Sequence, residues 1–213
     1  HQDMHAPSES RSFLIDAGAR VNGYASDITR TWGRGDARFE ALIAGVEREE
    51  LALVDQVRAG KDYREIHVDA HLRMASVLRE LGIVNMTPEA QVETGISSAF
   101  FPHGIGHLLG IQVHDIGGFS ASDEGGTLAK PEGHRYLRLT RTLEPGMVVT
   151  IEPGIYFIDM LLKPLRESAH ASDINWEAVA HLSRFGGVRI EDDVVCQAEG
   201  APENLSRDAF AAL

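Results

Sequence analysis

The sequence predicts an α+β fold, because a β-hairpin is followed by two amphipathic helices and then by strands joined through long loops. The chain has 213 residues, of which 43% are hydrophobic, which suits one globular domain over residues 1–213 with a sizeable core. Two small domains would also fit this length. No repeat of roughly 20–50 residues is present.

Residues 12–28 are predicted to form the hairpin. Strand formers occupy residues 13–15, and Asn22-Gly23 is the preferred two-residue turn. Residues that pair across this turn have numbers that sum to 45.

This register places Asp16 and Asp27 on the same face of the hairpin, as diagonal neighbours about 7–8 Å apart. Two such carboxylates can bracket a pair of cations, although two solvated acids on an exposed face would look the same in the sequence. Ile15 and Ile28 point to the other face, which we expect to pack into a core.

Two helices are predicted next. Asp36 is the expected N-cap of the first, and Gly60 ends its run of apolar residues. The second covers residues 62–81 and closes at Gly82. Residues 83–100 contain proline and glycine and allow at most a short helix.

His67 and His71 lie one helical turn apart on the second helix. The spacing resembles that of a zinc-binding helix, but the glutamate that should follow the first histidine is missing. We therefore interpret these histidines as ordinary helix surface.

The second half of the chain differs from the first in composition. Residues 101–118 are rich in glycine and histidine and predict loop and short strand, and residues 119–135 predict an exposed loop. Residues 148–157 and 188–195 are strand-like, and residues 159–185 between them are predicted to be an insertion.

Composition excludes several classes of function. The net charge of −12 argues against a nucleic-acid partner, because phosphate binding needs clustered lysine and arginine. No apolar run reaches the roughly 18–20 residues of a membrane span, so no membrane partner is expected. Cys196 is the single cysteine, which excludes an intrachain disulfide and favours the cytoplasm.

Two further acids stand at strand positions. Glu152 ends an apolar strand just before Pro153-Gly154, and Glu191 shares a strand face with Arg189, whose cation favours the ionised carboxylate. Taken separately, each would also suit an ordinary surface acid.

Three histidines lie within residues 103–114, namely His103, His107 and His114. Glycines flank the middle one and allow the backbone to approach a ligand closely. Imidazole is a good ligand for a borderline metal, so this segment indicates a functional site.

Four segments of this kind follow one another in order: LIDAGARVNGYASDITRTW, FPHGIGHLLGIQVHD, LEPGMVVTIEPGIYF and GGVRIEDDVV. They resemble the pita-bread metallopeptidases, most strongly the bacterial Xaa-Pro dipeptidases (prolidases), from about residue 11 to residue 195. The resemblance implies a pita-bread catalytic fold, present here as a C-terminal fragment that is incomplete on its N-terminal side and lacks an upstream recognition domain.

The resemblance also implies a dinuclear metal site with five ligands: Asp16, Asp27, His107, Glu152 and Glu191. Asp27 and Glu191 would bridge both ions, Asp16 would bind one ion, and His107 with Glu152 the other. Oxygen-rich ligation with one imidazole suits two Mn²⁺ ions, with Co²⁺ or Zn²⁺ as alternatives. A hydroxide bridging the ions would attack the peptide bond of an Xaa-Pro dipeptide and release proline.

Further roles are implied by the same resemblance. Glu152 would shuttle the proton, His114 would contact the substrate and stabilise the tetrahedral intermediate, and His103 would line the pocket. Arg138 would clamp the substrate carboxylate, a task that suits a planar bidentate cation. Arg189 and Tyr156 would order Glu191 and the substrate pocket.

Three alternatives stay open: a related pita-bread aminopeptidase, a homologue that hydrolyses organophosphates, and a non-enzymatic binding module. The resemblance further implies a homodimer. It also leads us to expect that the missing N-terminal segment, as part of the same chain or as a separate one, covers an apolar surface of this fragment.

Overall fold

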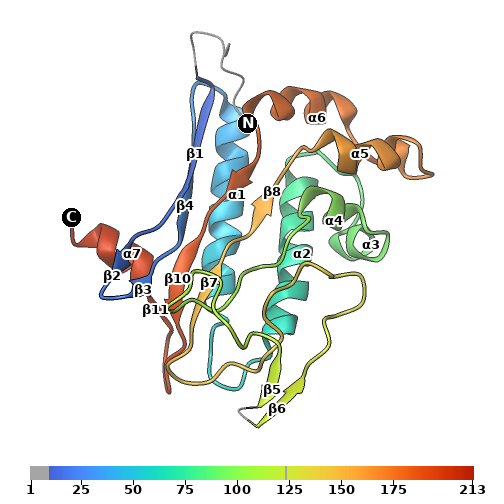
Figure 1. Ribbon diagram of the computed structural model, residues 1–213. Helices are drawn as coiled ribbons and strands as arrows, with labels where there is room; N and C mark the ends of the chain where they lie inside the picture. The colour runs from blue at the N-terminus through green and yellow to red at the C-terminus, as the bar shows by residue number, and fades with distance from the viewer. Residues whose placement is uncertain (1–9, 123) are drawn as a thin grey trace.

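The computed structural model describes residues 10–122 and 124–213 and confirms the α+β fold (Figure 1). The N-terminal half contains four strands and four helices: β1 (Ser12–Ala17), β2 (Arg20–Val21), β3 (Tyr24–Ala25), β4 (Ile28–Gly33), α1 (Ala37–Val54), α2 (Tyr63–Glu80), α3 (Pro88–Glu93) and α4 (Ile96–Phe100). The C-terminal half contains β5 (Ser120–Ser122), β6 (Gly125–Thr127), β7 (Val148–Ile151), β8 (Gly154–Ile155), α5 (Asp159–Arg166), η1 (Ala171–Asp173), α6 (Trp176–Leu182), η2 (Ser183–Phe185), β9 (Val188–Arg189), β10 (Asp192–Val195), β11 (Glu203–Asn204) and α7 (Leu205–Ala211).

The predicted hairpin register is confirmed. Asp16 pairs with Thr29 in the β1–β4 ladder and Arg20 with Ala25 in the β2–β3 ladder, so the residue numbers sum to 45 in both. The turn at Asn22-Gly23 has positive φ at both residues (52° and 90°), which explains this sequence at the turn. The hairpin is longer than predicted, because β4 continues to Gly33.

The expectation that Ile15 packs into a core is wrong. Ile15 is 41% exposed, and its neighbours on the same face, Phe13 and Trp32, are 55% and 51% exposed. Phe13 and Trp32 stack on each other with ring centroids 5.7 Å apart. The α7 residue Phe210 covers Arg30 on this face, but Phe13, Ile15 and Trp32 form an exposed apolar surface on the hairpin.

The first long helix begins at its predicted cap, and the second begins one residue after Asp62, where its predicted range starts. The Asp36 carboxylate accepts a hydrogen bond from the Phe39 N–H at the start of α1, and Asp62 caps α2 in the same way. α1 ends at Val54, earlier than predicted, and Gly82 (φ 62°) follows α2. Residues 83–100 form the two short helices α3 and α4 rather than one.

The interpretation of His67 and His71 as helix surface is also wrong. Their exposed fractions are 1% and 2%. This face of α2 is covered because α4 packs against the helix and Phe101 follows α4, so that the Phe101 ring lies 4.7 Å from the His71 ring. Helical spacing placed the two histidines on one face, but it could not show that the face is buried.

Strands of the C-terminal half form a central layer. β10 lies between β7 and β11, all antiparallel, and β8 pairs with β9. A bridge between Thr29 and Glu191 joins this layer to the hairpin, and a bridge between Leu108 and Val149 joins it to the histidine-rich loop. α1 packs against β4, β7 and β9 with α2 beside it. The hairpin, the histidine-rich loop and the two C-terminal strand segments therefore meet at this layer.

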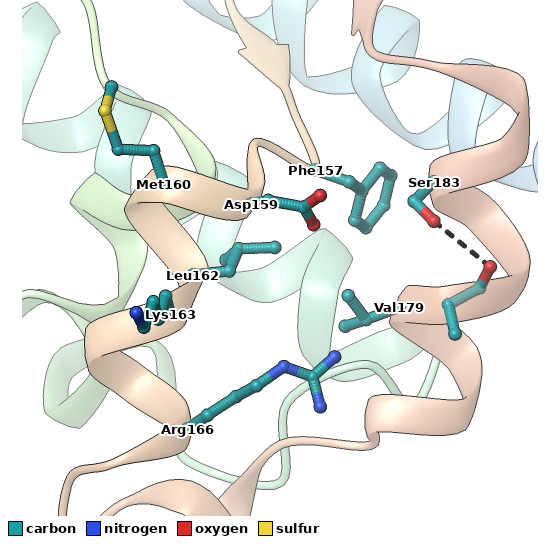
Figure 2. Close-up of a pocket in the computed structure, with 9 residues that line it drawn as sticks. Phe157, Asp159, Met160, Leu162, Lys163, Arg166, Val179 and Ser183 are labelled. Carbon is teal, nitrogen blue, oxygen red and sulfur yellow. Dashed lines mark hydrogen bonds between the residues drawn. The ribbon is translucent and has the colours of Figure 1, made fainter.

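The predicted insertion is helical. α5 and α6 enclose a cavity of about 440 Å³, into which Leu162 and Val179 point (Figure 2). Arg166 lies over the Trp176 ring at 4.0 Å, at the edge of the two helices. None of the residues predicted to carry chemistry lines this cavity. In the predicted exposed loop, the described residues 119–122 and 124–135 are mostly exposed and include the paired strands β5 and β6. In residues 10–122 and 124–213, no helix combines the length and apolar character that crossing a membrane requires.

Glu50 on α1 is a fully buried acid. Its oxygen lies 3.0 Å from Arg207, but that guanidinium is shared with Asp192 and Glu47. Burial, followed by the Asp192 charge, therefore raises the pKa of Glu50 to about 9 despite the ion pair.

This raised pKa predicts a pH dependence of stability. The folded state keeps the Glu50 proton up to about pH 9, whereas the unfolded state releases it near its ordinary value of 4.5. The free energy of unfolding therefore falls as pH rises through this window, by at most about 1.4 kcal/mol per pH unit. In thermal scans from pH 5 to 9, Glu50→Gln is expected to lose this decline. Parallel curves for both proteins would contradict the assignment.

Candidate metal centre

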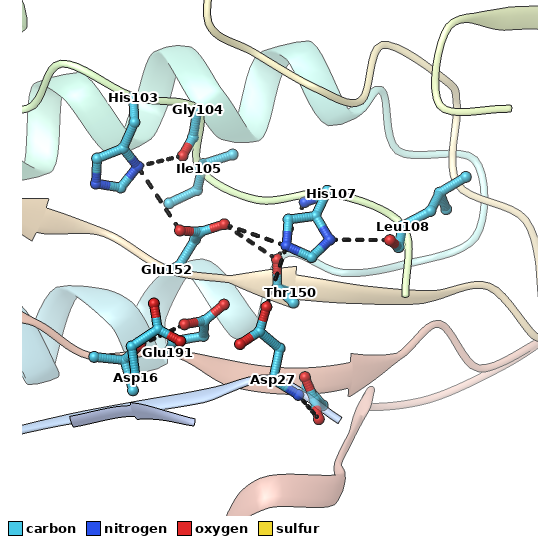
Figure 3. A network of polar contacts seen from close by, with 12 residues as sticks. Asp16, Asp27, His103, Gly104, Ile105, His107, Leu108, Thr150, Glu152 and Glu191 are labelled. Atoms are coloured by element: carbon cyan, nitrogen blue, oxygen red, sulfur yellow. Dashed lines mark hydrogen bonds and ion pairs between the residues drawn. The ribbon is translucent and has the colours of Figure 1, made fainter. Parts of the chain in front are cut away.

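Three carboxylates meet where the hairpin reaches the central strands. Asp16 lies on β1, Asp27 just before β4, and Glu191 between β9 and β10. One oxygen from each lies within 4.8 Å of the other two (Figure 3). The shared hairpin face predicted for Asp16 and Asp27 is confirmed, and the Thr29–Glu191 bridge adds the third acid.

His107 and Glu152 approach the same place from the other side. His107 Nε2 lies 3.6 Å from Asp27 Oδ2 and 3.7 Å from Glu152 Oε1. His107, Glu152 and Glu191 form a second group whose ligand atoms lie within 4.8 Å of one another. Glu191 belongs to both groups and Asp27 contacts both, so these two acids occupy the shared position. We call the set the five-residue cluster: Asp16, Asp27, His107, Glu152 and Glu191.

Gly106 explains how the histidine loop reaches the strands. A Cβ at this position would clash with the Thr150 carbonyl oxygen and the Tyr63 hydroxyl. Without that side chain the loop lies directly on β7, where His107 N–H donates to Thr150 Oγ1 (3.1 Å) and Glu152 N–H donates to Ile105 O (2.8 Å). The loop and the strand end thus hold His107 and Glu152 side by side.

The pKa shifts of the acids in the five-residue cluster are those expected of a site that binds cations. Burial and then the neighbouring Glu191 charge raise the pKa of Glu152 to about 8, and burial together with Asp27 raises the pKa of Glu191 to about 8 although Thr29 opposes the rise. The hydrogen bond from His107 lowers the pKa of Asp27. Buried carboxylates this close take up protons unless positive charge is supplied, and four acids with one imidazole fit divalent metals.

Thr29 and Arg189 hold the acids. Thr29 Oγ1 donates to Glu191 Oε2 (2.6 Å), and Arg189 Nε donates to Thr29 Oγ1 (3.2 Å). Arg189 also pairs with Asp16 and lies 3.7 Å from Glu191, which confirms its predicted place beside that acid.

His103 and Tyr156 extend this network. Arg189 Nη1 donates to Tyr156 Oη (3.1 Å), which lies 2.9 Å from His103 Nε2. Burial lowers the pKa of His103 to about 4, so the ring is neutral. Its Nδ1 is 2.8 Å from the Gly104 carbonyl oxygen and donates to it, which leaves Nε2 to accept from Tyr156.

A cavity of about 1050 Å³ opens beside the five-residue cluster. Asp16, His107 and Glu152 line one part of it, and His114 and Arg138 line it as well. The His114 ring lies 4.4 Å from the His107 ring at a nearly perpendicular angle. Three of the predicted substrate residues therefore line the same space as three of the predicted metal ligands: His114, Arg138 and Arg189 with Asp16, His107 and Glu152.

The comparisons with known proteins agree with this geometry. Residues 5–198 match the metallopeptidase family M24. The chain belongs to this family. It is 58% identical over 208 residues to Xaa-Pro dipeptidase of Xanthomonas campestris pv. campestris (strain B100) and 57% identical to that of Stenotrophomonas maltophilia (strain K279a). Each match covers 97% of this chain and 47% of the relative, so the chain spans about half the length of these curated relatives.

Solved structures of similar M24 proteins confirm the pita-bread fold. Aminopeptidase PepP of Pseudomonas aeruginosa superimposes with a TM-score of 0.69 at 31% identity. Zinc-substituted Escherichia coli aminopeptidase P in complex with product gives 0.66 at 30% identity. Both matches cover 92% of this chain and 38% of the solved chain.

Several residues around this M24 site were not found from the sequence. Thr29 follows Asp27 on the same strand face, so strand alternation could have identified it. Asp193 Oδ2 accepts from Asp27 N–H (3.1 Å), and Tyr63 Oη donates to Thr150 O (2.7 Å). No local pattern predicts these two contacts, because each joins segments more than 80 residues apart.

Thr29→Val tests the support of Glu191. The change keeps the shape of the side chain but removes a buried hydrogen bond to the carboxylate, so metal affinity is expected to fall about 10–100-fold. Thr31→Val is the matched control, because Thr31 lies on the same strand and bonds the backbone oxygen of Arg189. Equal metal affinity in Thr29→Val and wild type, measured by equilibrium dialysis, would contradict the role.

Proposed function

We propose that the protein containing this chain is a metal-dependent Xaa-Pro dipeptidase that releases proline from the C-terminal end of Xaa-Pro dipeptides. The observation that supports this most directly is the five-residue cluster at the wall of a cavity that Arg138 also lines. The identity of 58% to a curated Xaa-Pro dipeptidase supports the same substrate class.

The five-residue cluster would hold two divalent cations. Asp27 and Glu191 occupy the position shared by both groups, Asp16 joins one group, and His107 with Glu152 joins the other. We propose Mn²⁺ because carboxylates dominate the ligands, with Co²⁺ or Zn²⁺ as alternatives. Two such ions would activate a water molecule and polarise the scissile carbonyl.

The remaining residues would bind substrate and move protons. Glu152 lines the cavity beside His107, so besides binding metal it would be placed to accept the proton of the activated water and pass it on. Arg138 would hold the carboxylate of the dipeptide, and His114 would contact the reacting carbonyl. His103, Tyr156 and Arg189 would keep the wall of the pocket and the acids in place.

A dedicated enzyme is expected for this substrate. The imide nitrogen of proline carries no hydrogen, so peptidases that recognise the N–H at that position lose a hydrogen bond. A site that recognises metal-bound carbonyl and terminal carboxylate does not depend on that hydrogen.

The main alternative is an aminopeptidase acting on longer peptides, which the similarity to aminopeptidase P structures favours. The two activities differ in what lies beyond the second residue, because a carboxylate clamp at Arg138 would select dipeptides. Organophosphate hydrolysis stays a possible side activity of the same site. A binding module without activity is disfavoured, because all five cluster residues are present and adjacent.

The proposed function is tested with the intact protein. With added Mn²⁺ it is expected to release proline from an Xaa-Pro dipeptide, and a chelator should stop the reaction. Tripeptides with the same first two residues provide the comparison with the aminopeptidase alternative. If the intact protein binds no divalent metal, the proposal fails.

A further segment of the same protein is proposed to cover the apolar hairpin face. Phe13, Ile15 and Trp32 are all more than 40% exposed, and the matched relatives are about twice as long as this chain. The chain of 213 residues expressed alone is therefore expected to aggregate or to need the remaining segment. Its purification as a stable, soluble monomer, judged by size-exclusion chromatography and a cooperative thermal transition, would refute this.

Two further proposals concern assembly and location. We propose a homodimer, which light scattering of the intact protein would test. The cytoplasm is proposed because Cys196 is a free, buried thiol, which suits a reducing compartment.

A further inference from the structure

Three histidines gather beside the histidine-rich loop and form a group separate from the five-residue cluster. His67 and His71 lie on α2, and His134 lies in the segment that leads to Arg138. We call them the three-histidine cluster. One ring nitrogen from each lies within 4.8 Å of the other two. None of the predicted metal ligands or substrate residues is among these three histidines.

The rings are arranged as ligands around a common point. The three centroid separations are 4.8, 4.7 and 4.6 Å, and the ring planes are steeply inclined, at 86°, 86° and 66°. Three imidazoles bound to one metal at the usual 2.0–2.1 Å have centroids roughly 4.5–5.2 Å apart, for angles between octahedral and tetrahedral. The observed triangle lies inside that range.

The type of ligand atom determines which metal ion the three-histidine cluster would bind. We infer that the three-histidine cluster is a second metal site that binds a borderline transition metal, Zn²⁺ or Cu²⁺, through three neutral imidazoles. It contains no carboxylate, so it should discriminate strongly against Mn²⁺ and Mg²⁺, which prefer oxygen ligands. Burial lowers the pKa of His67 to about 2 and of His71 to about 3, so both rings are neutral at pH 7 as metal ligands must be.

Binding requires one change of tautomer. Ile105 N–H donates to His67 Nδ1 (3.3 Å), so His67 carries its proton on Nε2 and donates it to His134 Nδ1 (2.9 Å). A metal takes the place of this shared proton, and the His67 proton moves to Nδ1. The Ile105 N–H must then shift, because two N–H donors would otherwise face each other at 3.3 Å. His71 Nδ1 lies 3.2 Å from Ser97 Oγ, which leaves its Nε2 for the metal.

A fourth ligand has room to enter. The three-histidine cluster lines a cavity of about 240 Å³. His103, Tyr136 and Pro102 line both this cavity and the larger one beside the five-residue cluster. Water or a small anion can therefore complete the coordination of a metal held by three protein ligands.

Copper spectroscopy on the intact protein tests the site. The five-residue cluster is first saturated with Mg²⁺, which prefers oxygen ligands and, being diamagnetic, adds no resonance of its own, and one equivalent of Cu²⁺ is then added. The paramagnetic resonance spectrum is expected to show coupling to three imidazole nitrogens, whereas copper in the five-residue cluster would show one. A wild-type spectrum with a single nitrogen would overturn the proposal without the need for any variant.

Variants provide the second arm. His134→Gln is preferred because this residue is only half-buried in a loop, and it should weaken Zn²⁺ uptake beyond the Mn²⁺ centre by more than about 100-fold. His170→Gln is the matched control, since this histidine lies beside Asp173 in the insertion, outside the cluster. Equal Zn²⁺ content in the two variants, measured by mass spectrometry of the metals, would contradict the site. Neither result depends on dipeptidase activity.

Discussion

Asp27→Asn is expected to abolish metal binding and hydrolysis together. Asp27 contacts both groups of ligands, so its loss should weaken both ions at once. The amide is neutral and is a weaker ligand than a carboxylate, so the variant also loses one of the four acidic groups that would offset the charge of two divalent ions. We expect a loss of metal affinity well above the about 10–100-fold that follows removal of a residue supporting a ligand.

The measurement is metal content and proline release on the same preparation of intact protein. Asp159→Asn is the matched control, because this acid lies on α5 and lines the separate cavity of the insertion (Figure 2). It should keep both properties. Full activity of Asp27→Asn would exclude this residue as a ligand.

Arg138→Ala is expected to separate two classes of substrate. If Arg138 holds the terminal carboxylate, its removal breaks a charge-assisted bidentate contact. Such a contact is worth about 1.5–3 kcal/mol, which corresponds to roughly 10–150-fold in kcat/KM. Dipeptides should lose this factor in kcat/KM. Dipeptide amides, which lack a free carboxylate, should lose much less.

Arg135→Ala controls for general loss of positive charge at the cavity. Arg135 lines the same space but lies over the Tyr136 ring at 4.6 Å. Its removal should affect acids and amides alike and only slightly. Equal losses on both substrates for Arg138→Ala would contradict the carboxylate clamp.

Much of the fold follows from local patterns. The Asn22-Gly23 turn set the hairpin register, since only one pairing is compatible with positive φ at both residues. The caps at Asp36 and Asp62 began the long helices, because a side-chain oxygen there satisfies a free backbone N–H. Such signals operate over a few residues and can be read directly from the sequence.

Part of the candidate site could be predicted in the same way. Strand alternation alone placed Asp16 beside Asp27 and Arg189 beside Glu191, and the structure has both pairs. That these residues form one site together with His107 and Glu152 was predicted only from the resemblance to a family. No local pattern predicts that Thr29 bonds Glu191 across 162 positions of the chain.

What the sequence by itself determined is therefore the register of the hairpin, the starts of the helices and the residue types that can bind metal. Only the tertiary structure decided which side chains are buried. It left Ile15 exposed and buried His67 and His71, although periodicity suggested the reverse in both cases. The physical reason is that periodicity records which side chains share a face, whereas the exposure of that face depends on which distant segment packs against it.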